Sequence, residues 1–310
     1  MSDDPDNILK QDDDRHCAVV AVVGAPNAGK STLVNALVGT KVSIVSPTPQ
    51  TTRTRVMGIA GEGVTQIVYV DTPGLFKPQR RLERAMTSAA WDSLAGADFA
   101  LTVVDVSRTR PSAETIALIE RLATADIRRI LVLNKVDLIR PQKLLALAAS
   151  LNQKADFEQT FMVSALNGDR VSDIAAFLTK EAPKGPWLYP DDQLSDMSDR
   201  QLAAELVREK LFLRLRQELP HDLTVEAESW EQFDNGSVRI GMVIYVRRDS
   251  QKAIVLGHGG AMIKAVGEAA RLELEEILGH RVHVSLFVKV RSEWPEDPER
   301  YETWGLDFNA

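Results

Sequence analysis

Gly24-Ala25-Pro26-Asn27-Ala28-Gly29-Lys30-Ser31 matches the pattern GxxxxGK[ST], and this stretch decides the fold. A run of small and β-branched apolar residues, Cys17 to Val23, precedes it and predicts a strand buried on both faces. Residues Lys30 to Leu37 predict a helix directly after it. A glycine-rich loop between a strand and a helix N-terminus directs backbone N–H groups at an anion. The stretch therefore predicts a phosphate-binding loop.

Two side chains at the end of this loop have the chemistry that a nucleoside triphosphate requires. We expect Lys30 to reach the β- and γ-phosphates and the Ser31 hydroxyl to bind Mg²⁺. The other candidate nucleotide contacts in the loop are Gly24, Pro26, Asn27, Ala28, Gly29 and Thr32.

The rest of the first half alternates short apolar runs with helical stretches. The runs are 66–70, 99–104, 130–133 and 160–163, and the helical stretches are 83–94, 114–123, 142–151 and 171–178. Strands that alternate with helices pair in parallel, which predicts a doubly wound α/β domain of the P-loop NTPase class.

Asn134-Lys135-Val136-Asp137 follows the apolar run 130–133 and indicates which base is bound. Ligands of such sheets bind at the carboxyl ends of the strands. A carboxylate at Asp137 can accept hydrogen bonds from N1–H and N2–H₂ of guanine, and adenine offers no such pair of donors. Ser164-Ala165-Leu166 follows the last run and matches a loop that covers the guanine. The NKVD motif and its position in the sequence favour GTP over ATP as the bound nucleotide.

Asp71-Thr72-Pro73-Gly74 follows the run 66–70, where a carboxylate can hold Mg²⁺ through water. The N–H of Gly74 can sense the γ-phosphate, so the segment that follows can respond to hydrolysis. Residues 71–74 and Leu75 are candidate nucleotide contacts. Leu75 stands where Ras-like proteins carry a water-orienting glutamine, and an apolar side chain cannot do that work. The polar, threonine-rich stretch 46–55 predicts a second switch loop, in which Thr51 or, preferably, Thr52 binds Mg²⁺.

The pattern changes at 181–197, which is rich in proline and aspartate and is typical of a linker. Beyond it, Ser198 or Asp199 predicts the cap of a helix that runs to about Leu219. The Asp234-Asn235-Gly236 turn separates two strand-like runs. The runs are 223–233 and 237–247, and they are followed by helices over 251–256 and 261–278 and a strand over 282–290. The resulting order is α-β-β-α-α-β.

Gly257-His258-Gly259-Gly260 lies between the last two helices of that order. A GxxG turn between two helices clamps about four nucleotides of single-stranded RNA in KH domains. Basic residues in the surrounding sequence are the other candidate RNA contacts: Arg247, Arg248, Lys252 and Lys264. The alternative is an ordinary turn between two helices with a solvated basic face.

Composition limits the remaining possibilities. The net charge of −7 argues against a protein that coats nucleic acid without specificity, although it leaves room for a local basic site. A single cysteine, Cys17, favours a reducing, cytoplasmic setting. No apolar run is long enough to span a bilayer. Residues 1–14 are acidic and polar, so we expect a disordered tail.

Taken together, the motifs resemble those of the Era family of bacterial GTPases. The matching stretches are GAPNAGKST, SIVSPTPQTTR, DTPGLF, NKVD, SAL, GHGG and the tail that contains Trp294. The resemblance implies a GTPase domain over 15–181, a linker over 182–197 and a type II KH domain with a C-terminal tail over 198–310. It implies a cytoplasmic, monomeric switch that binds the 3′ end of 16S rRNA and assists assembly of the small (30S) ribosomal subunit. It also implies peripheral association with the inner membrane.

The resemblance has consequences for single residues as well. Asn27 is similar to the asparagine that helps related GTPases to hold K⁺. Family members usually carry Lys or Arg inside GxxG, where this chain has His258, so we expect lower or more pH-dependent RNA affinity.

Three other functions are compatible with parts of the sequence. They are a GTPase whose second domain binds a protein or a membrane, an RNA-binding scaffold that senses GTP without hydrolysing it, and an ATPase, which the NKVD motif disfavours.

Overall fold

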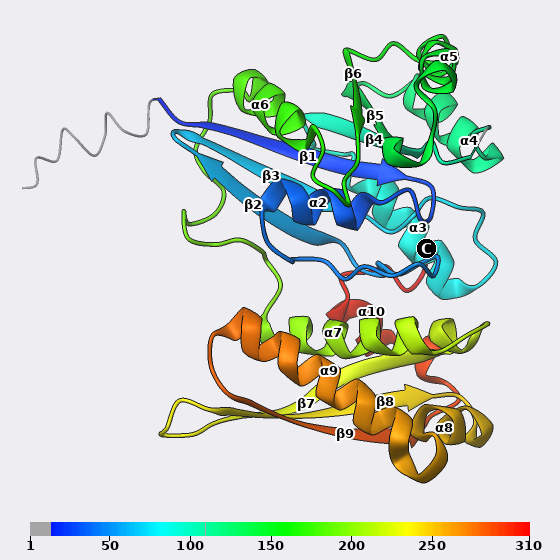
Figure 1. Cartoon of the computed structure of the whole chain (residues 1–310), viewed down its shortest axis with the longest axis vertical. Coiled ribbons are helices and arrows are strands. Elements are labelled where there is room, and N and C mark those ends of the chain that lie inside the picture. The colour runs from blue at the N-terminus through cyan, green and yellow to red at the C-terminus, as the bar shows by residue number, and fades with distance from the viewer. Residues whose placement is uncertain (1–13, 109) are drawn as a thin grey trace, which may run out of the picture. The chain divides into compact units, whose positions relative to one another are not determined.

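The computed structural model describes residues 14–108 and 110–310 (Figure 1). The described chain forms two compact units. The first contains Thr52–Asp196, the residues before Ile44, and Thr303–Ala310, and the second contains Ile44–Thr51 and Met197–Glu302. The expected disordered tail lies outside the described residues, except for Asp14.

A six-stranded sheet in the order β2-β3-β1-β4-β5-β6 forms the centre of the first unit. Its strands are β1 (His16–Gly24), β2 (Val56–Glu62), β3 (Thr65–Asp71), β4 (Phe99–Asp105), β5 (Arg128–Asn134) and β6 (Gln159–Val163). Five strands are parallel, as predicted, and β2 pairs antiparallel with β3. The sequence analysis missed β2, because its glycines Gly58 and Gly61 interrupt the apolar pattern.

Helices cover both faces of this sheet. They are α2 (Lys30–Val38), α3 (Arg81–Asp92), α4 (Ala113–Leu122), α5 (Pro141–Asn152) and α6 (Val171–Glu181). One core joins the sheet to α2 and α6 through residues such as Leu33 and Ile174. Two further cores join it to α3, α4 and α5 through Ala90, Ile119 and Leu144. This arrangement confirms the doubly wound class and leaves the carboxyl ends of the strands to form a site.

The segment expected to be a linker lies along the edge of the sheet as far as Asp196. The backbone carbonyl of Leu194 accepts a hydrogen bond from Ile59 N–H of β2 at 2.9 Å. The Asp196 carboxylate accepts one from Met57 N–H at 2.9 Å. Gln66 of β3 donates to the carbonyl of Tyr189 at 2.8 Å. The bonds to Ile59 and Met57 pair backbone groups that the edge strand β2 would leave open.

The second unit has the predicted order of elements. They are α7 (Asp199–Arg214), β7 (Leu223–Gln232), β8 (Val238–Val246), α8 (Asp249–Leu256), α9 (Ala261–Leu278) and β9 (Val282–Val290), with the short helix α10 (Pro298–Thr303) after them. The sheet order is β7-β8-β9, with β7 antiparallel and β9 parallel to β8. Alternate residues of β8 and β9 form one core with α7 and α9, so both helices lie on the same face of the sheet.

The first helix of this unit begins as expected and ends early. The Ser198 hydroxyl accepts a hydrogen bond from Gln201 N–H and caps α7. The helix ends at Arg214 rather than near Leu219. Leu215 has extended backbone, with a ψ of 158°, and Gln217 has a φ of 59°, so the chain turns here, before a short 3-10 helix at Leu219–Asp222.

The stretch Ile44–Thr51 belongs to the second unit through specific contacts. Ile44 is part of the apolar core of that unit. Glu209 of α7 accepts a hydrogen bond from Val45 N–H at 2.8 Å, and Arg208 donates one to the carbonyl of Thr51 at 2.6 Å. Residues 46–51 of the stretch predicted to be a switch loop therefore belong to the second unit, and α7 bonds to the chain at Val45 and Thr51.

None of the helices over residues 14–108 and 110–310 is both long and apolar enough to span a membrane.

Candidate functional site

The loop after β1 approaches neighbouring segments so closely that only glycine fits at two of its positions. A Cβ on Gly24 would lie 2.5 Å from the carbonyl oxygen of Val103. Gly29 has a φ of +92°, and a Cβ there would lie 2.3 Å from the Asn134 side-chain nitrogen. The loop is therefore packed against the carboxyl ends of β4 and β5, as a phosphate-binding loop requires.

Lys30 is buried inside this loop, with a side chain that is 6% exposed. Its Nζ donates to the carbonyl oxygens of Gly24 and Ala25, each at 3.2 Å. Burial lowers the pKa of Lys30 to about 8, although the charge of Asp71 opposes this change. A phosphate in the loop would supply the negative charge that the buried ammonium lacks.

Three oxygen-bearing side chains from separate segments converge beside Lys30. The hydroxyls of Ser31 and Thr52 lie 2.9 Å apart, and the Thr52 hydroxyl donates to Asp71 Oδ2 at 3.4 Å. Within the described residues, Asp71 Oδ1 is buried and has no hydrogen-bond partner. Burial raises the pKa of Asp71, and Ser31 and Lys30 offset only part of the rise. An oxygen cluster with an uncompensated carboxylate fits a hard cation such as Mg²⁺.

The structure distinguishes between the two threonines considered as magnesium ligands. Thr52 is directed at the Ser31–Asp71 cluster. The Thr51 hydroxyl instead bonds to Ser46 at 2.6 Å and donates to the carbonyl of Thr48 at 2.7 Å.

The segment after Asp71 is fixed against the phosphate-binding loop. The Thr72 hydroxyl donates to the carbonyl of Val22 at 2.8 Å, and a Cβ on Gly74 would lie 2.9 Å from Pro26 Cα. The side chain of Leu75, a predicted nucleotide contact, is 5% exposed and part of the core around Ala90. Only the Leu75 N–H faces the loop, where it donates to the carbonyl of Gly24 at 3.1 Å.

Asn134 joins the phosphate-binding loop to the loop that matches SAL. Its Nδ2 donates to the carbonyl of Ala28 at 2.9 Å, and its Oδ1 accepts from Ala165 N–H at 2.9 Å. Lys135 has a φ of 70° and donates from Nζ to the carbonyl of Asn27 at 2.7 Å. The carboxylate of Asp137 is exposed and carries no hydrogen bond to the described residues, and Leu166 beside this region is 82% exposed. Asn134 thus ties these loops together, while the carboxylate of Asp137 is open to solvent and to a base.

Asp105 at the end of β4 is a member of this site that the sequence analysis missed. It accepts a hydrogen bond from Lys135 Nζ at 2.6 Å. Burial alone would raise the pKa of Asp105, but hydrogen bonds from Lys135 and Ser107 outweigh that effect and lower it. Its position at the carboxyl end of an apolar strand was the available signal, since the same position drew attention to Asp71 and Asn134.

The GHGG turn forms a tight corner between α8 and α9. Gly257, Gly259 and Gly260 all have positive φ, of 72°, 56° and 79°. A Cβ on Gly257 would lie 2.6 Å from Met262 Cβ, whereas Gly259 and Gly260 face open space. His258 is exposed. The turn presents backbone that a ligand can approach closely.

The basic residues predicted around this turn have different surroundings. Arg247 pairs with Asp222 at 3.7 Å and donates to the carbonyl of Ser292 at 3.3 Å, so its charge is partly compensated. Arg248 is exposed at the start of α8. Lys264 is exposed on α9 and Lys252 is half-buried on α8.

Two family models match the chain in the expected halves. A model described as a 50S ribosome-binding GTPase matches residues 19–135, and a KH domain model matches residues 218–295. Together they coincide with the nucleotide site and with the GHGG turn.

Full-length relatives match as well. GTPase Era of Brucella suis is 56% identical over 290 residues, which are 93% of each chain. GTPase Era of Afipia carboxidovorans is 53% identical over 305 residues, which are 98% of this chain and 99% of that protein.

Solved structures extend the likeness to three dimensions. A crystal structure of Era with MgGDPNP and nucleotides 1506–1542 of 16S ribosomal RNA has a TM-score of 0.88 and 35% identity. A variant of Aquifex aeolicus Era bound to GDP and AlF₄⁻ has a TM-score of 0.86 and 36% identity. Each comparison covers 94% of this chain and 99% of the other. The chain belongs to the Era family of GTPases.

Proposed function

We propose that the protein is a GTP-hydrolysing switch that binds the 3′ end of 16S rRNA through its KH domain and assists assembly of the 30S subunit. The convergence of Ser31, Thr52 and Asp71 beside the buried Lys30 carries the first part of this proposal. The GHGG turn, inside a region that matches the KH model, supports the second part. The proposed functional domains are 15–181 and 198–310, joined by 182–197.

GTP is held at three places in this proposal. Lys30 and the backbone of residues 24–32 contact the phosphates, and the carboxylate of Asp137 accepts the two donors of guanine. Ser31 and Thr52 bind Mg²⁺ directly, and Asp71 holds it through water; the ion shields the phosphate charge that develops on hydrolysis. Asn134 acts by positioning, because both ends of its amide are used within the protein.

The attacking water is oriented by groups other than Leu75, whose side chain is in the core. We propose that Asn27 would help to hold K⁺, which would add positive charge beside the transferred phosphate. The expected result is single-turnover phosphate release that is several-fold faster in KCl than in NaCl, and an Asn27→Ala variant that loses this difference. Equal rates in both salts would contradict the role of K⁺. Absence of phosphate release would instead favour a scaffold that only senses GTP.

The GHGG turn clamps the RNA backbone in this proposal, with Lys264 and Arg248 contributing charge. We expect Gly260→Asp to lower the affinity for a 16S rRNA 3′-end oligonucleotide at least about tenfold, since the new carboxylate repels phosphate. Gly260 faces open space, so the new side chain meets no neighbouring atom, and the strain that its φ of +79° imposes on a side chain is what the control variant must match. Gly257 is a poorer choice, because any side chain there meets Met262.

The matched control is Gly63→Asp, at another positive-φ glycine with open space around it. Titration of the labelled oligonucleotide measures both variants. Unchanged RNA affinity in Gly260→Asp would favour the alternative in which the second domain binds a protein or a membrane.

Nucleotide state and RNA binding are coupled in this proposal through the stretch 44–51. Thr52 reaches the proposed magnesium ion, while the preceding carbonyl, of Thr51, is bonded to Arg208 of α7. A change in the position of Thr52 would therefore shift the Thr51 carbonyl and its hydrogen bond to Arg208 in the second unit.

We further propose a cytoplasmic monomer that associates peripherally with the inner membrane, as the family resemblance implies.

A further inference from the structure

The sheet of the second unit has one face that α7 and α9 do not cover. Ile240, Met242, Val284 and Leu286 point toward these helices and belong to their core. Because side chains alternate along a strand, Arg239, Gly241, His283, Ser285 and Phe287 lie on the opposite face. We refer to these five residues as the open face.

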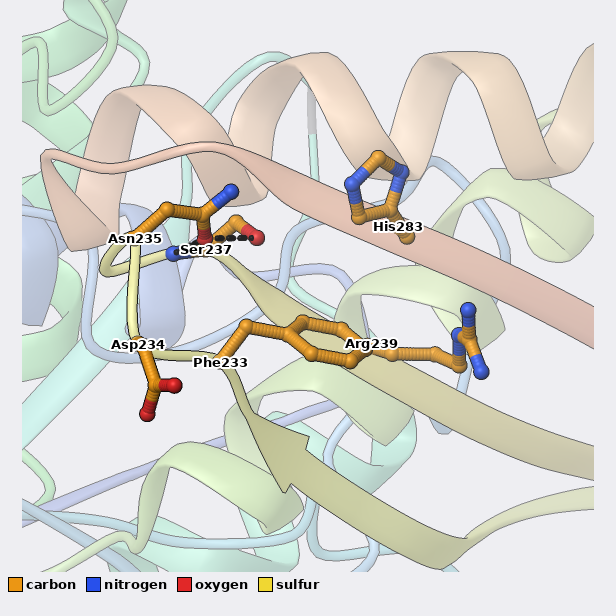
Figure 2. A pocket seen from close by; sticks show the side chains of 6 residues that line it. All are labelled: Phe233, Asp234, Asn235, Ser237, Arg239 and His283. Atoms are coloured by element: carbon orange, nitrogen blue, oxygen red, sulfur yellow. Dashed lines mark hydrogen bonds between the residues drawn. The ribbon is translucent and has the colours of Figure 1, made fainter.

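A hollow of about 550 Å³ lies at the hairpin end of the open face (Figure 2). It is lined by Phe233, Asp234, Asn235, Ser237, Arg239 and His283. Figure 2 shows Arg239 and His283 on neighbouring strands, with Phe233 and the turn residues beside them. The hollow thus combines an aromatic ring, two basic groups and the polar groups of a turn.

The two basic side chains of the hollow interact only weakly with the rest of the described protein. Arg239 pairs with Glu231 at 3.5 Å, both side chains being 57% exposed, and its guanidinium lies 5.1 Å from the Phe233 ring centre. Exposed pairs of this kind contribute little to stability. His283 is exposed and has no hydrogen-bond partner among the described residues. Both groups are available to an incoming anion.

Phe287 lies four residues along β9 from His283, which corresponds to about 13 Å of strand. Its side chain is 59% exposed and stands beside Val243, its partner in the register. Between Phe287 and the hollow the floor is made of small residues. Gly241 pairs with Ser285 on one side and Ser229 on the other, and the Ser229 hydroxyl lies over Gly241, so no large side chain separates the two ends.

We infer that the open face binds a second stretch of single-stranded RNA, with one base on Phe287 and another in the hollow. Exposed aromatic side chains on a sheet stack unpaired bases, and arginine and histidine can meet the phosphates between them. Asn235 and Asp234 offer groups that can bond to base edges. A protein partner is the less favoured occupant, because the floor between the two ends lacks large apolar side chains.

This surface is distinct from the GHGG clamp, which lies between α8 and α9. The inference rests on the proposed RNA-binding function and adds a second contact to it. The affinity of an RNA that occupies only the GHGG clamp should not depend on Phe287, whereas the affinity of a longer strand should.

The test compares two unstructured RNAs, of 4 and 12 nucleotides, binding to the full chain loaded with a GTP analogue. Stacking of one base on an aromatic side chain contributes about 1–3 kcal/mol, so Phe287→Leu should weaken the 12-mer about 5- to 150-fold. The 4-mer should bind the variant and the original chain equally. Phe287→Trp should restore binding of the 12-mer, since it restores an aromatic ring.

Leu213→Ala is the matched control, because Leu213 is 50% exposed on α7 in the same unit. Unchanged intrinsic GTP hydrolysis verifies the fold of each variant. Equal affinity of the Phe287→Leu variant and the original chain for the 12-mer would overturn the inference while leaving the clamp intact. A variant that binds RNA normally but no longer binds purified 30S subunits would also overturn it, in favour of a protein contact. Failure of both RNAs to bind the original chain would remove the proposed RNA function itself.

Discussion

Asp137→Asn is expected to convert the protein from a GTP-binding to a xanthine-nucleotide-binding protein. The carboxylate is exposed beside the Asn134 network and carries no hydrogen bond to the described residues. Each charge-assisted hydrogen bond that it makes to guanine contributes about 1.5–3 kcal/mol. Loss of the pair should therefore lower GTP affinity by about 100-fold or more. An asparagine amide can instead donate to the 2-oxo group of xanthine.

Competition between labelled GTP and unlabelled XTP measures this change directly. Asp126→Asn, at an exposed carboxylate of the same unit, is the control and should leave the preference for GTP unaltered. If Asp137→Asn still preferred GTP, the base would have to be recognised elsewhere, and the assignment of the NKVD motif would be wrong.

Lys30→Met should have two opposite effects: it should abolish useful GTP binding and stabilise the nucleotide-free protein. Removing one partner of a buried charged contact costs about 3–5 kcal/mol, which corresponds to a loss of at least about 100-fold in GTP affinity. In the nucleotide-free protein, however, burial of the Lys30 ammonium lowers the free energy of unfolding. Its pKa falls from 10.5 to about 8, which corresponds to about 3 kcal/mol at neutral pH. Lys30→Met removes this cost and so stabilises the nucleotide-free protein, although the loss of the hydrogen bonds to Gly24 and Ala25 offsets part of the gain.

The pH dependence of this stabilisation follows from proton binding. Between about pH 8 and 10.5 the unfolded chain holds more protons on Lys30 than the folded chain, so stability rises with pH across this window. The advantage of Lys30→Met is complete below pH 8 and should shrink toward pH 10. Urea unfolding at pH 7 and 9.5 tests this, with Lys143→Met on the exposed side of α5 as the control. If the variant were less stable than the original chain at pH 7, burial of the Lys30 ammonium would not destabilise the nucleotide-free protein.

The sequence predicted most of the fold where local chemistry and tertiary structure agree. The helix at Ala261–Leu278 and the Asp234–Gly236 turn have the predicted limits, because glycines bound the helix and a strong turn signal separates the strands. Strand β2 was missed, since its partner β3 and the segment near Leu194 stabilise it rather than its own pattern.

The residues of the candidate site could be predicted where they lie within one continuous sequence motif. Thr52 was preferred over Thr51 from the sequence, and in the structure the Thr52 hydroxyl lies at Ser31 and Asp71 while the Thr51 hydroxyl bonds to Ser46. Asp105 was missed because it acts through Lys135, a partner 30 residues away in the chain. The partial compensation of Arg247 by Asp222 was likewise invisible, since two segments distant in sequence meet only in the folded unit.

The most direct test of the whole account is titration of a labelled oligonucleotide matching the 3′ end of 16S rRNA, with the protein loaded with a GTP analogue or with GDP. Tight binding is expected with the analogue and weak binding with GDP, because Thr52 reaches the proposed magnesium site while the carbonyl of Thr51 is bonded to Arg208. Equal binding in both states would keep the RNA function and contradict the coupling. Absence of binding in either state would contradict the account and leave only the GTPase assignment.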